Sequence, residues 1–189
     1  MSESNTGSPG DATPGKEEGF GEVFMFSVKY LFPPLCSRQE LINVLDGFCL
    51  VENEKANESS SREGAHEEHR TSAYDFLYLP IDFRTKKSRG FAFVNFTDAS
   101  TVWKFFDAFH LKNWDSVDRK KWTKKIEVVC AKIQGKEALV KHFSDSMFEC
   151  ETDEFLPVGF NPPRDGSGEP VKLRTIGNRR VPVPSPCSH

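Results

Sequence analysis

The strongest candidates for chemistry in this sequence are two phenylalanines in the stretch 89–96, which reads Arg-Gly-Phe-Ala-Phe-Val-Asn-Phe. Alternate side chains of a β-strand point to opposite faces, so Phe91 and Phe93 would share one face. Large exposed aromatic rings are costly in water unless they bind something, and nucleobases stack on such rings with about 1–3 kcal/mol per base. Arg89 would pair with a phosphate or stack on a base, and Gly90 would allow close approach of the backbone. The competing interpretation is an aromatic strand inside a core.

Basic side chains flank this stretch. Lys86 and Lys87 lie in a turn just before it, and Lys132 lies in the next predicted strand. A further basic cluster precedes that strand: Lys120, Lys121, Lys124 and Lys125. The chain has a net charge of −3, but residues 73–148 carry 14 Lys/Arg against 9 Asp/Glu, a net of +5. Because binding follows the local field of a surface, we expect these cations to contact phosphates, with a solvated surface as the alternative.

The sequence indicates neither catalysis nor a bound metal or other cofactor. His66 and His69 fall in a polar segment without convincing ligand partners, and Asp75 and Asp82 are explained as charges at strand ends. The 5 Cys are scattered with no C-x-x-C pair, which supports neither a disulfide framework nor a zinc module. There is no signal-peptide pattern and no apolar run of about 18 residues. We therefore expect a non-enzymatic, intracellular protein, nuclear or cytoplasmic, with no membrane partner.

Seven segments have patterns typical of regular structure, and they must position the two rings. Strands are predicted over 23–28, 74–83, 90–96 and 126–133, and helices over 38–48, 98–110 and 136–143. Ser37 and Glu40 form a capping box at the first helix, which could fray toward Lys55, and Asp98 caps the second. This order predicts an α+β fold, a ferredoxin-like βαββαβ sandwich with two helices on one face and an extra C-terminal helix. The other face is expected to stay open, which leaves the two rings available.

Three polar segments are predicted to lie outside the packed core. Residues 1–20 are rich in Gly, Ser, Pro and Glu and are expected to be disordered. Residues 52–71 are predicted to form a long, flexible acidic loop that narrows the path of a nucleic acid. Residues 149–189 are predicted to be an extended or disordered tail that offers protein partners a site. The folded domain is therefore predicted over 21–148.

Residues 89–96 match the RNP1 pattern of RNA recognition motifs at every defined position, and they form the third strand of the predicted topology. The segments YDFLYLPIDF, RTKKSRGFAFVNF, AKIQGKEALVKHF and FLPVGFNPPRDGSGEP resemble the C-terminal RNA recognition motif of Mei2-like proteins, and the last is similar to the plant terminal-ear-like branch. The resemblance covers residues 37–170. It implies an RNA-binding module in a family associated with meiosis and plant development, and a short form with only the last motif.

The sequence departs from this family in two places. Relatives carry a Met-Ile-Arg-Asn-Ile-Pro-Asn-like stretch in the first strand, and here two registers remain open. One makes 23–28 the RNP2 strand with Phe24 as the stacking aromatic, and the other uses 28–32 and puts Tyr30 near the surface. Cys130 stands where relatives usually have Tyr, which would remove a stacking group from the fourth strand.

Two functions are consistent with these residues. The first is a monomeric module that binds single-stranded RNA by aromatic stacking and phosphate contacts, in post-transcriptional or developmental control. The second is a protein-interaction module on the same fold with weak or no RNA binding, using the helical face or the C-terminal tail.

Overall fold

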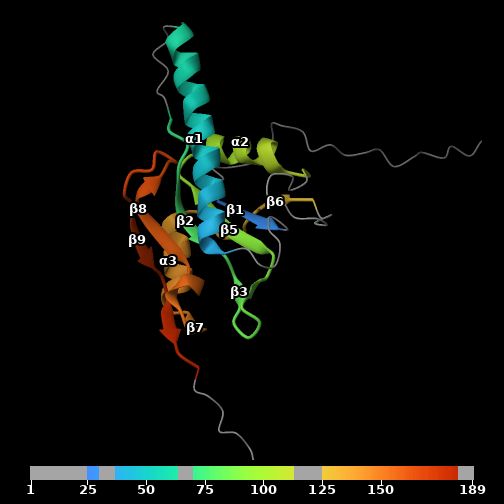
Figure 1. Ribbon diagram of the computed structural model, residues 1–189, viewed down its shortest axis with the longest axis vertical. Helices are drawn as coiled ribbons and strands as arrows, with labels where there is room; N and C mark the ends of the chain where they lie inside the picture. Colours follow the sequence, from blue (N-terminus) through green and yellow to red (C-terminus); the bar gives the residue numbers. More distant parts are fainter. Residues whose placement is uncertain (1–24, 30–36, 64–69, 113–124, 183–189) are drawn as a thin grey trace, which may run out of the picture.

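The computed structural model describes residues 25–29, 37–63, 70–112 and 125–182, of which 25–29 and 60–63 are described by their backbone alone (Figure 1). The α-helices are α1 (Arg38–Glu63), α2 (Ala99–Phe109) and α3 (Lys136–Ser144). The strands are β1 (Met25–Lys29), β2 (Tyr74–Tyr78), β3 (Ile81–Asp82), β4 (Lys87–Ser88), β5 (Phe91–Phe96), β6 (Glu127–Cys130), β7 (Met147–Glu149), β8 (Val158–Arg164), β9 (Lys172–Thr175) and β10 (Asn178–Arg180). A 3-10 turn spans Asp153–Phe155.

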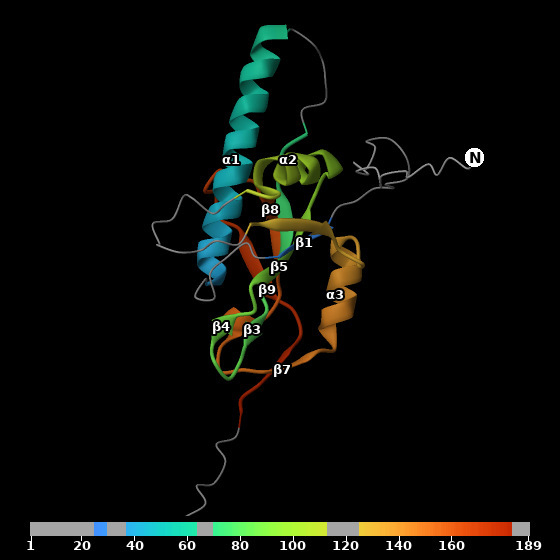
Figure 2. The ribbon, with the colours of Figure 1, turned by 90° about the vertical axis from the view of Figure 1, so that its right-hand side faces the viewer.

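Six strands form one antiparallel sheet in the order β6-β1-β5-β2-β8-β9. The first four of these carry the predicted βαββαβ connectivity, which confirms the predicted α+β sandwich. Strand β5, which holds the two candidate rings, lies between β1 and β2 in the interior of the sheet. Figure 2 shows α1 and α3 on opposite sides of this sheet. The remaining strands form a short β3–β4 hairpin and a parallel β7–β10 pair.

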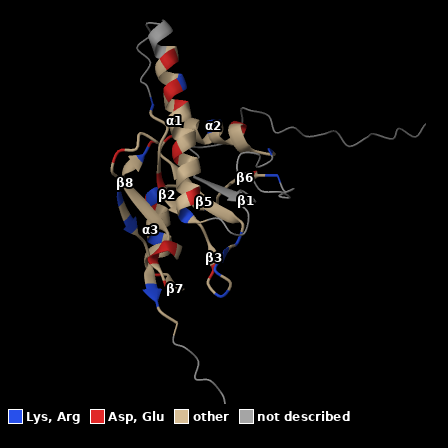
Figure 3. Cartoon of the chain, viewed as in Figure 1, with Lys and Arg blue, Asp and Glu red and all other residues tan. Residues whose placement is uncertain are grey.

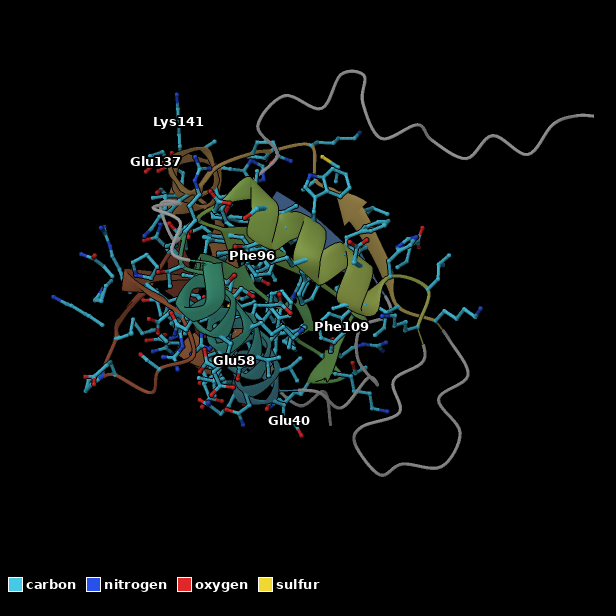
Figure 4. The ribbon with its side chains drawn as sticks, turned by 90° about the horizontal axis from the view of Figure 1, so that it is seen from above. Glu40, Glu58, Phe96, Phe109, Glu137 and Lys141 are labelled. Atoms are coloured by element: carbon cyan, nitrogen blue, oxygen red, sulfur yellow. The ribbon has the colours of Figure 1, made fainter. Side chains whose placement is uncertain are left out.

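The main core lies between the sheet and the helices α1 and α2. Ala92, Val94 and Phe96 of β5 are fully buried in it, as expected from their alternation along the strand. The Phe96 ring centroid lies 6.0 Å from that of Phe48 in α1 and 5.3 Å from that of Phe105 in α2. Viewed from above, Phe96 lies between these two helices (Figure 4). The β5 face with Phe91 and Phe93 is therefore the face turned away from α1 and α2.

Both predicted helix starts are confirmed. At α1, the Ser37 backbone N–H donates to Glu40 Oε2 at 2.7 Å and the Glu40 N–H donates to Ser37 Oγ at 3.2 Å. At α2, the Asp98 carboxylate accepts from the Ser100 N–H at 2.8 Å. These bonds satisfy backbone donors that have no partner within the helix itself.

Helix α1 is much longer than the helix predicted over 38–48, so the predicted flexible loop over 52–71 is wrong for residues 52–63. This part of α1 projects beyond the sheet (Figure 1). It is polar all round because little packs against it, so it lacks the apolar repeat by which the sequence reveals helices. Asn53 fixes the returning chain, because it accepts from the Ser72 N–H at 2.7 Å and donates to the Ser72 carbonyl at 3.0 Å. Residues 64–69 lie outside the described part.

The prediction of an extended or disordered tail over 149–189 is also wrong for the residues up to 182. Strand β8 pairs with β2 and extends the sheet, and β9 pairs with β8. Val158 and Phe160 of β8 are buried in the main core, next to Tyr74. The prolines and charges that suggested a tail lie on the exposed end of β8 and in the following loop, whereas the few apolar residues face inward. The domain therefore extends at least to residue 182, well beyond the predicted limit of 148.

A largely buried ion pair attaches this C-terminal segment to α1. Arg164 at the end of β8 donates to both oxygens of Asp46, at 3.0 and 2.5 Å. The Tyr74 hydroxyl donates to Asp46 Oδ1 at 2.8 Å. The hydrogen bonds to Asp46 raise the pKa of Arg164, and burial raises the pKa of Tyr74. Bidentate pairing of this kind fixes geometry as well as charge, so β8 is held in one position against α1.

The glycines after β8 provide a test of this attachment. Gly166 and Gly168 have positive φ values of 84° and 79°, so alanine costs backbone strain at both, about 1–2 kcal/mol. A Cβ at Gly166 would lie 2.2 Å from the Asp46 carbonyl oxygen, whereas a Cβ at Gly168 would meet nothing within 4 Å. We expect Gly166→Ala to lower the free energy of unfolding by about 1–3 kcal/mol more than Gly168→Ala, measured by urea titration. Equal losses would show that this loop does not rest against α1.

Candidate nucleic-acid interface

Phe91 and Phe93 lie together at the start of β5, as predicted. Their ring centroids are 5.7 Å apart with the planes at 89°, and both side chains are half-buried. They are not beneath α1 or α2, because their strand neighbours Ala92 and Val94 occupy that core. The two rings therefore form a partly exposed aromatic pair on the second face of the sheet.

The backbone just before this pair is fixed in a tight turn. The Arg89 N–H donates to the Pro80 carbonyl at 2.9 Å, and the Gly90 N–H donates to Ser88 Oγ at 3.0 Å. Gly90 has a φ of 84°, a conformation in which a side chain would be strained. Arg89 is exposed, and within the described part of the chain its guanidinium has no ion pair. Its charge is thus available beside the rings.

The prediction that this face is left open is wrong on the β2 side, because α3 covers it. A second cluster, formed by Phe76, Ala131, Leu139 and Ile176, lies between the sheet and α3. Phe143 of α3 stacks on Phe76 of β2, with centroids 6.0 Å apart and planes at 18°. Phe93 packs against the edge of this cluster, so it is only partly accessible. The sequence showed that α3 is amphipathic, but not which surface it would cover.

Both ends of α3 are held by specific contacts. At its N-terminus, Lys136 Nζ donates to the Phe160 carbonyl of β8 at 2.8 Å and lies 3.5 Å from Asp75 Oδ2 of β2. At its C-terminus, the Asn178 side-chain amide donates to the Ser144 carbonyl at 3.2 Å. Helix α3 is therefore fixed in position on this face of the sheet.

Asp75 connects α3 to the RNP1-like strand. Asn95 of β5 is only 4% exposed, and its Nδ2 donates to Asp75 Oδ1 at 2.8 Å. Burial raises the pKa of Asp75, while the Asn95 hydrogen bond and Lys136 act in the opposite direction. Asp75 had been explained from the sequence as a strand-end charge. In the structure, Asp75 instead lies at a β-bulge between Tyr74 and Phe76, in contact with Lys136 of α3.

Tyr78 is a member of this surface that the sequence interpretation missed. It lies directly opposite Phe93 in the β2–β5 ladder, with ring centroids 6.3 Å apart and planes at 12°. Phe143 contacts its other side at 5.1 Å. The alternation in 74–78 is interrupted by the bulge, which sends Tyr74 to the helix face and leaves Tyr78 beside Phe93. Because of that irregularity, the face of Tyr78 could not be assigned from the strand period alone.

Comparison with known proteins agrees with this geometry. Residues 53–144 match the family model described as RNA recognition motif 2. The protein terminal ear1 homolog of Oryza sativa subsp. indica is 40% identical over 158 residues, which cover 82% of this chain and 22% of the relative. Protein terminal ear1 of Zea mays is 38% identical over 186 residues, which cover 98% of this chain and 26% of the relative. Protein MEI2-like 6 of Oryza sativa subsp. japonica is 40% identical over 140 residues, which cover 74% of this chain and 42% of the relative.

The chain is a member of the Mei2-like family, in its terminal-ear branch. This confirms the resemblance that the spaced sequence motifs indicated. The chain spans between 22% and 42% of the length of these three relatives. The similarity therefore identifies the domain, and the activities of the longer relatives enter only as proposals.

The first strand of this Mei2-like motif agrees better with the first of the two predicted registers. Strand β1 covers 25–29, and Ser27 lies opposite Phe93 in the β1–β5 ladder. Phe24 and Tyr30, the two candidate stacking residues, both lie outside the described residues. Cys130 pairs with Phe26 in the β1–β6 ladder and lies two residues after the core residue Val128. Position 130 is therefore on the helix face of the sheet and is not a neighbour of Phe93.

The lysines that were predicted to contact phosphates lie in different environments. Lys86 Nζ forms an ion pair with Glu151, so its charge is partly neutralised. Lys87, Lys125 and Lys132 are exposed, and none has an ion pair within the described ranges. The cluster members Lys120, Lys121 and Lys124 lie outside those ranges. Figure 3 shows acidic residues along α1 and basic residues on β9 and beside β3. Phosphate contact by these lysines stays a prediction.

No metal site or membrane span is found in the part of the chain that the structure describes. No three His, Cys, Asp or Glu side chains there come close enough to hold a metal ion. None of the helices described is long and apolar enough to cross a membrane.

The contact between Lys136 and Asp75 predicts a pH-dependent loss of stability. Lys136→Met leaves the buried Asp75 carboxylate without its cation, so we expect the free energy of unfolding to fall by about 1–3 kcal/mol at neutral pH. The pKa of Asp75, already raised by burial, then rises further. The loss should therefore shrink as the pH falls through that raised pKa, because a protonated carboxyl needs no cation.

Urea unfolding at several pH values measures this effect, and Lys141→Met is the matched control. Lys141 is an exposed lysine on the same helix and points away from the sheet (Figure 4). We expect it to change stability little at any pH. A loss for Lys136→Met that is independent of pH would contradict the role assigned to Asp75.

Proposed function

We propose that this Mei2-like motif binds single-stranded RNA without catalysing a reaction, by stacking bases on Phe91 and Phe93. The observation that carries the proposal is this half-exposed aromatic pair, which lies on the sheet face turned away from α1 and α2. Aromatic rings at such a site gain about 1–3 kcal/mol for each stacked base. The family match to an RNA recognition motif supports the same function.

The geometry favours an unpaired strand over a duplex. A base can stack on the Phe91 or Phe93 ring only when it is turned out of a helix, as in single-stranded loops and ends. Helix α3 occupies the β2 side of the sheet, so the accessible surface lies toward β5 and the strands beyond it. The proposed site is thus short, with room for few bases.

Electrostatics would add affinity but little sequence preference. Lys87 of β4 and Arg89, which lies between β4 and β5, are exposed and come just before the aromatic pair in the chain. Phosphate contacts by such side chains release counterions, and the logarithm of affinity falls by about 0.7 per contact for each tenfold rise in salt. The acidic helix α1 lies on the other face of the sheet, away from the proposed RNA-binding surface (Figure 2).

The biological role proposed with this binding is post-transcriptional control in development or meiosis, inside the cell. It rests on the family and on the terminal ear1 and MEI2-like relatives. A monomer is proposed as the binding form. The alternative of a pure protein-interaction module loses support, because the segment expected to serve as a free tail is folded: β8 and β9 extend the sheet, and β10 pairs with β7.

The proposal predicts that the double variant Phe91→Ala, Phe93→Ala loses binding. Removing two stacking rings should weaken the affinity for a fluorescein-labelled random 10-nucleotide RNA by roughly 30-fold or more, at about 1–3 kcal/mol per ring. Fluorescence anisotropy at fixed salt measures this change, and circular dichroism checks that the variant is folded.

Trp103→Ala provides the control for this experiment. Trp103 is a 43% exposed aromatic residue on α2, so its removal tests whether any exposed ring contributes. We expect its affinity to match that of the unmodified protein. Unchanged binding by the folded double variant would refute the proposed function.

A further inference from the structure

Tyr78 presents a hydroxyl group that the fold does not use. Within the described residues this hydroxyl makes no hydrogen bond, although its ring contacts Phe93, Phe143 and Phe148. Tyrosine hydroxyls in packed surroundings usually find a partner, as that of Tyr74 does with Asp46 at 2.8 Å. Strand β2 therefore carries one tyrosine whose hydroxyl has a structural partner on the helix face, and one on the opposite face whose hydroxyl has none within the described ranges.

The surrounding rings hold Tyr78 in one orientation. Phe143 of α3 meets it edge to face at 5.1 Å and 65°, and Phe148 of β7 does so at 5.9 Å and 71°. On the third side the Tyr78 ring lies nearly parallel to that of Phe93. A side chain confined in this way loses little conformational freedom when it binds a ligand. The Tyr78 ring is thus held in a fixed position beside the Phe93 ring.

The neighbouring groups suit the recognition of a nucleotide. The Arg89 N–H donates to the carbonyl of Pro80, two residues after Tyr78, so the exposed Arg89 lies near the end of β2. Burial raises the pKa of Tyr78, and the positive charge of Arg89 acts in the opposite direction. A base stacked on Phe93 directs its polar edge outward within a plane parallel to the ring, and the Tyr78 ring is nearly parallel to that plane. A phenol both donates and accepts hydrogen bonds, so it can pair with either kind of group on that edge.

We propose that Tyr78 is a third RNA-contacting residue, whose hydroxyl hydrogen-bonds the nucleotide stacked on Phe93. The inference rests on the proposed function, because it requires a nucleotide at Phe93. The hydroxyl would bond either the edge of the base or the ribose 2′-hydroxyl, which share the same hydrogen-bonding chemistry. In this arrangement Phe93 contributes stacking that tolerates any base, and Tyr78 contributes selectivity.

The experiment compares two tyrosines of the same strand that lie on opposite faces of the sheet. Tyr78→Phe in the full chain should weaken binding of a fluorescein-labelled random 10-nucleotide RNA by about 2- to 10-fold, as expected for one neutral hydrogen bond. Its melting temperature should stay unchanged, because the hydroxyl has no partner within the described fold. Tyr74→Phe should do the opposite, lowering the melting temperature through the lost bond to Asp46 while leaving the affinity unchanged.

A matching random DNA of the same length separates the two sources of the bond. If Tyr78→Phe weakens RNA and DNA binding equally, the partner is the base edge; if only RNA binding weakens, the partner is the 2′-hydroxyl. If Tyr78→Phe binds both like the unmodified protein while Phe93→Ala binds weakly, the inference is overturned and the proposed function stands. If the unmodified protein binds neither, both are overturned.

Discussion

Strand β5 is packed on both of its faces, and this constraint determines what the Mei2-like motif can offer to a ligand. On one face, Ala92, Val94 and Phe96 are fully buried beneath α1 and α2. On the other, Asn95 is bonded to the buried carboxylate of Asp75, and Phe93 touches the cluster beneath α3. Only the start of the strand remains open, so the binding surface is narrower than a four-stranded sheet with one bare face.

The C-terminal segment and α3 form one structural unit with the sheet. Lys136 binds β2 through Asp75 and β8 through the Phe160 carbonyl, so a single side chain joins the helix to two neighbouring strands. Strand β8 is in turn attached to α1 through Asp46 and Arg164. The position of α3 on the second face of the sheet therefore depends on β8. Helix α3 and β8 together limit the surface that is accessible around Phe91 and Phe93.

The parts of the fold that depend on local sequence could be predicted. The alternation in β5 placed Phe91 and Phe93 on one face, and the side-chain oxygens of Ser37 and Asp98 marked the two helix starts. The order of elements then identified the sandwich. These features are set by residues within one or two turns of each other, which is the range over which periodicity and capping operate.

The parts that depend on distant contacts could not be predicted. The helical residues 52–63 have no apolar face to reveal them, and β8 has too few apolar residues to stand out from its prolines. The helical pattern of α3 was visible, but its docking site is defined by Phe76 on another element. Tyr78 was missed because a bulge changes the parity of its strand. For β8 and α3, the deciding partner lies far away in the sequence.

The Asp46–Arg164 pair has a consequence for how the chain is made. Its two residues are 118 positions apart, so Asp46 emerges from the ribosome long before Arg164 has been added. Until β8 has been added, β2 has no partner strand on that side. Without β8, the strand β2 would present unpaired backbone N–H and C=O groups at the edge of the sheet.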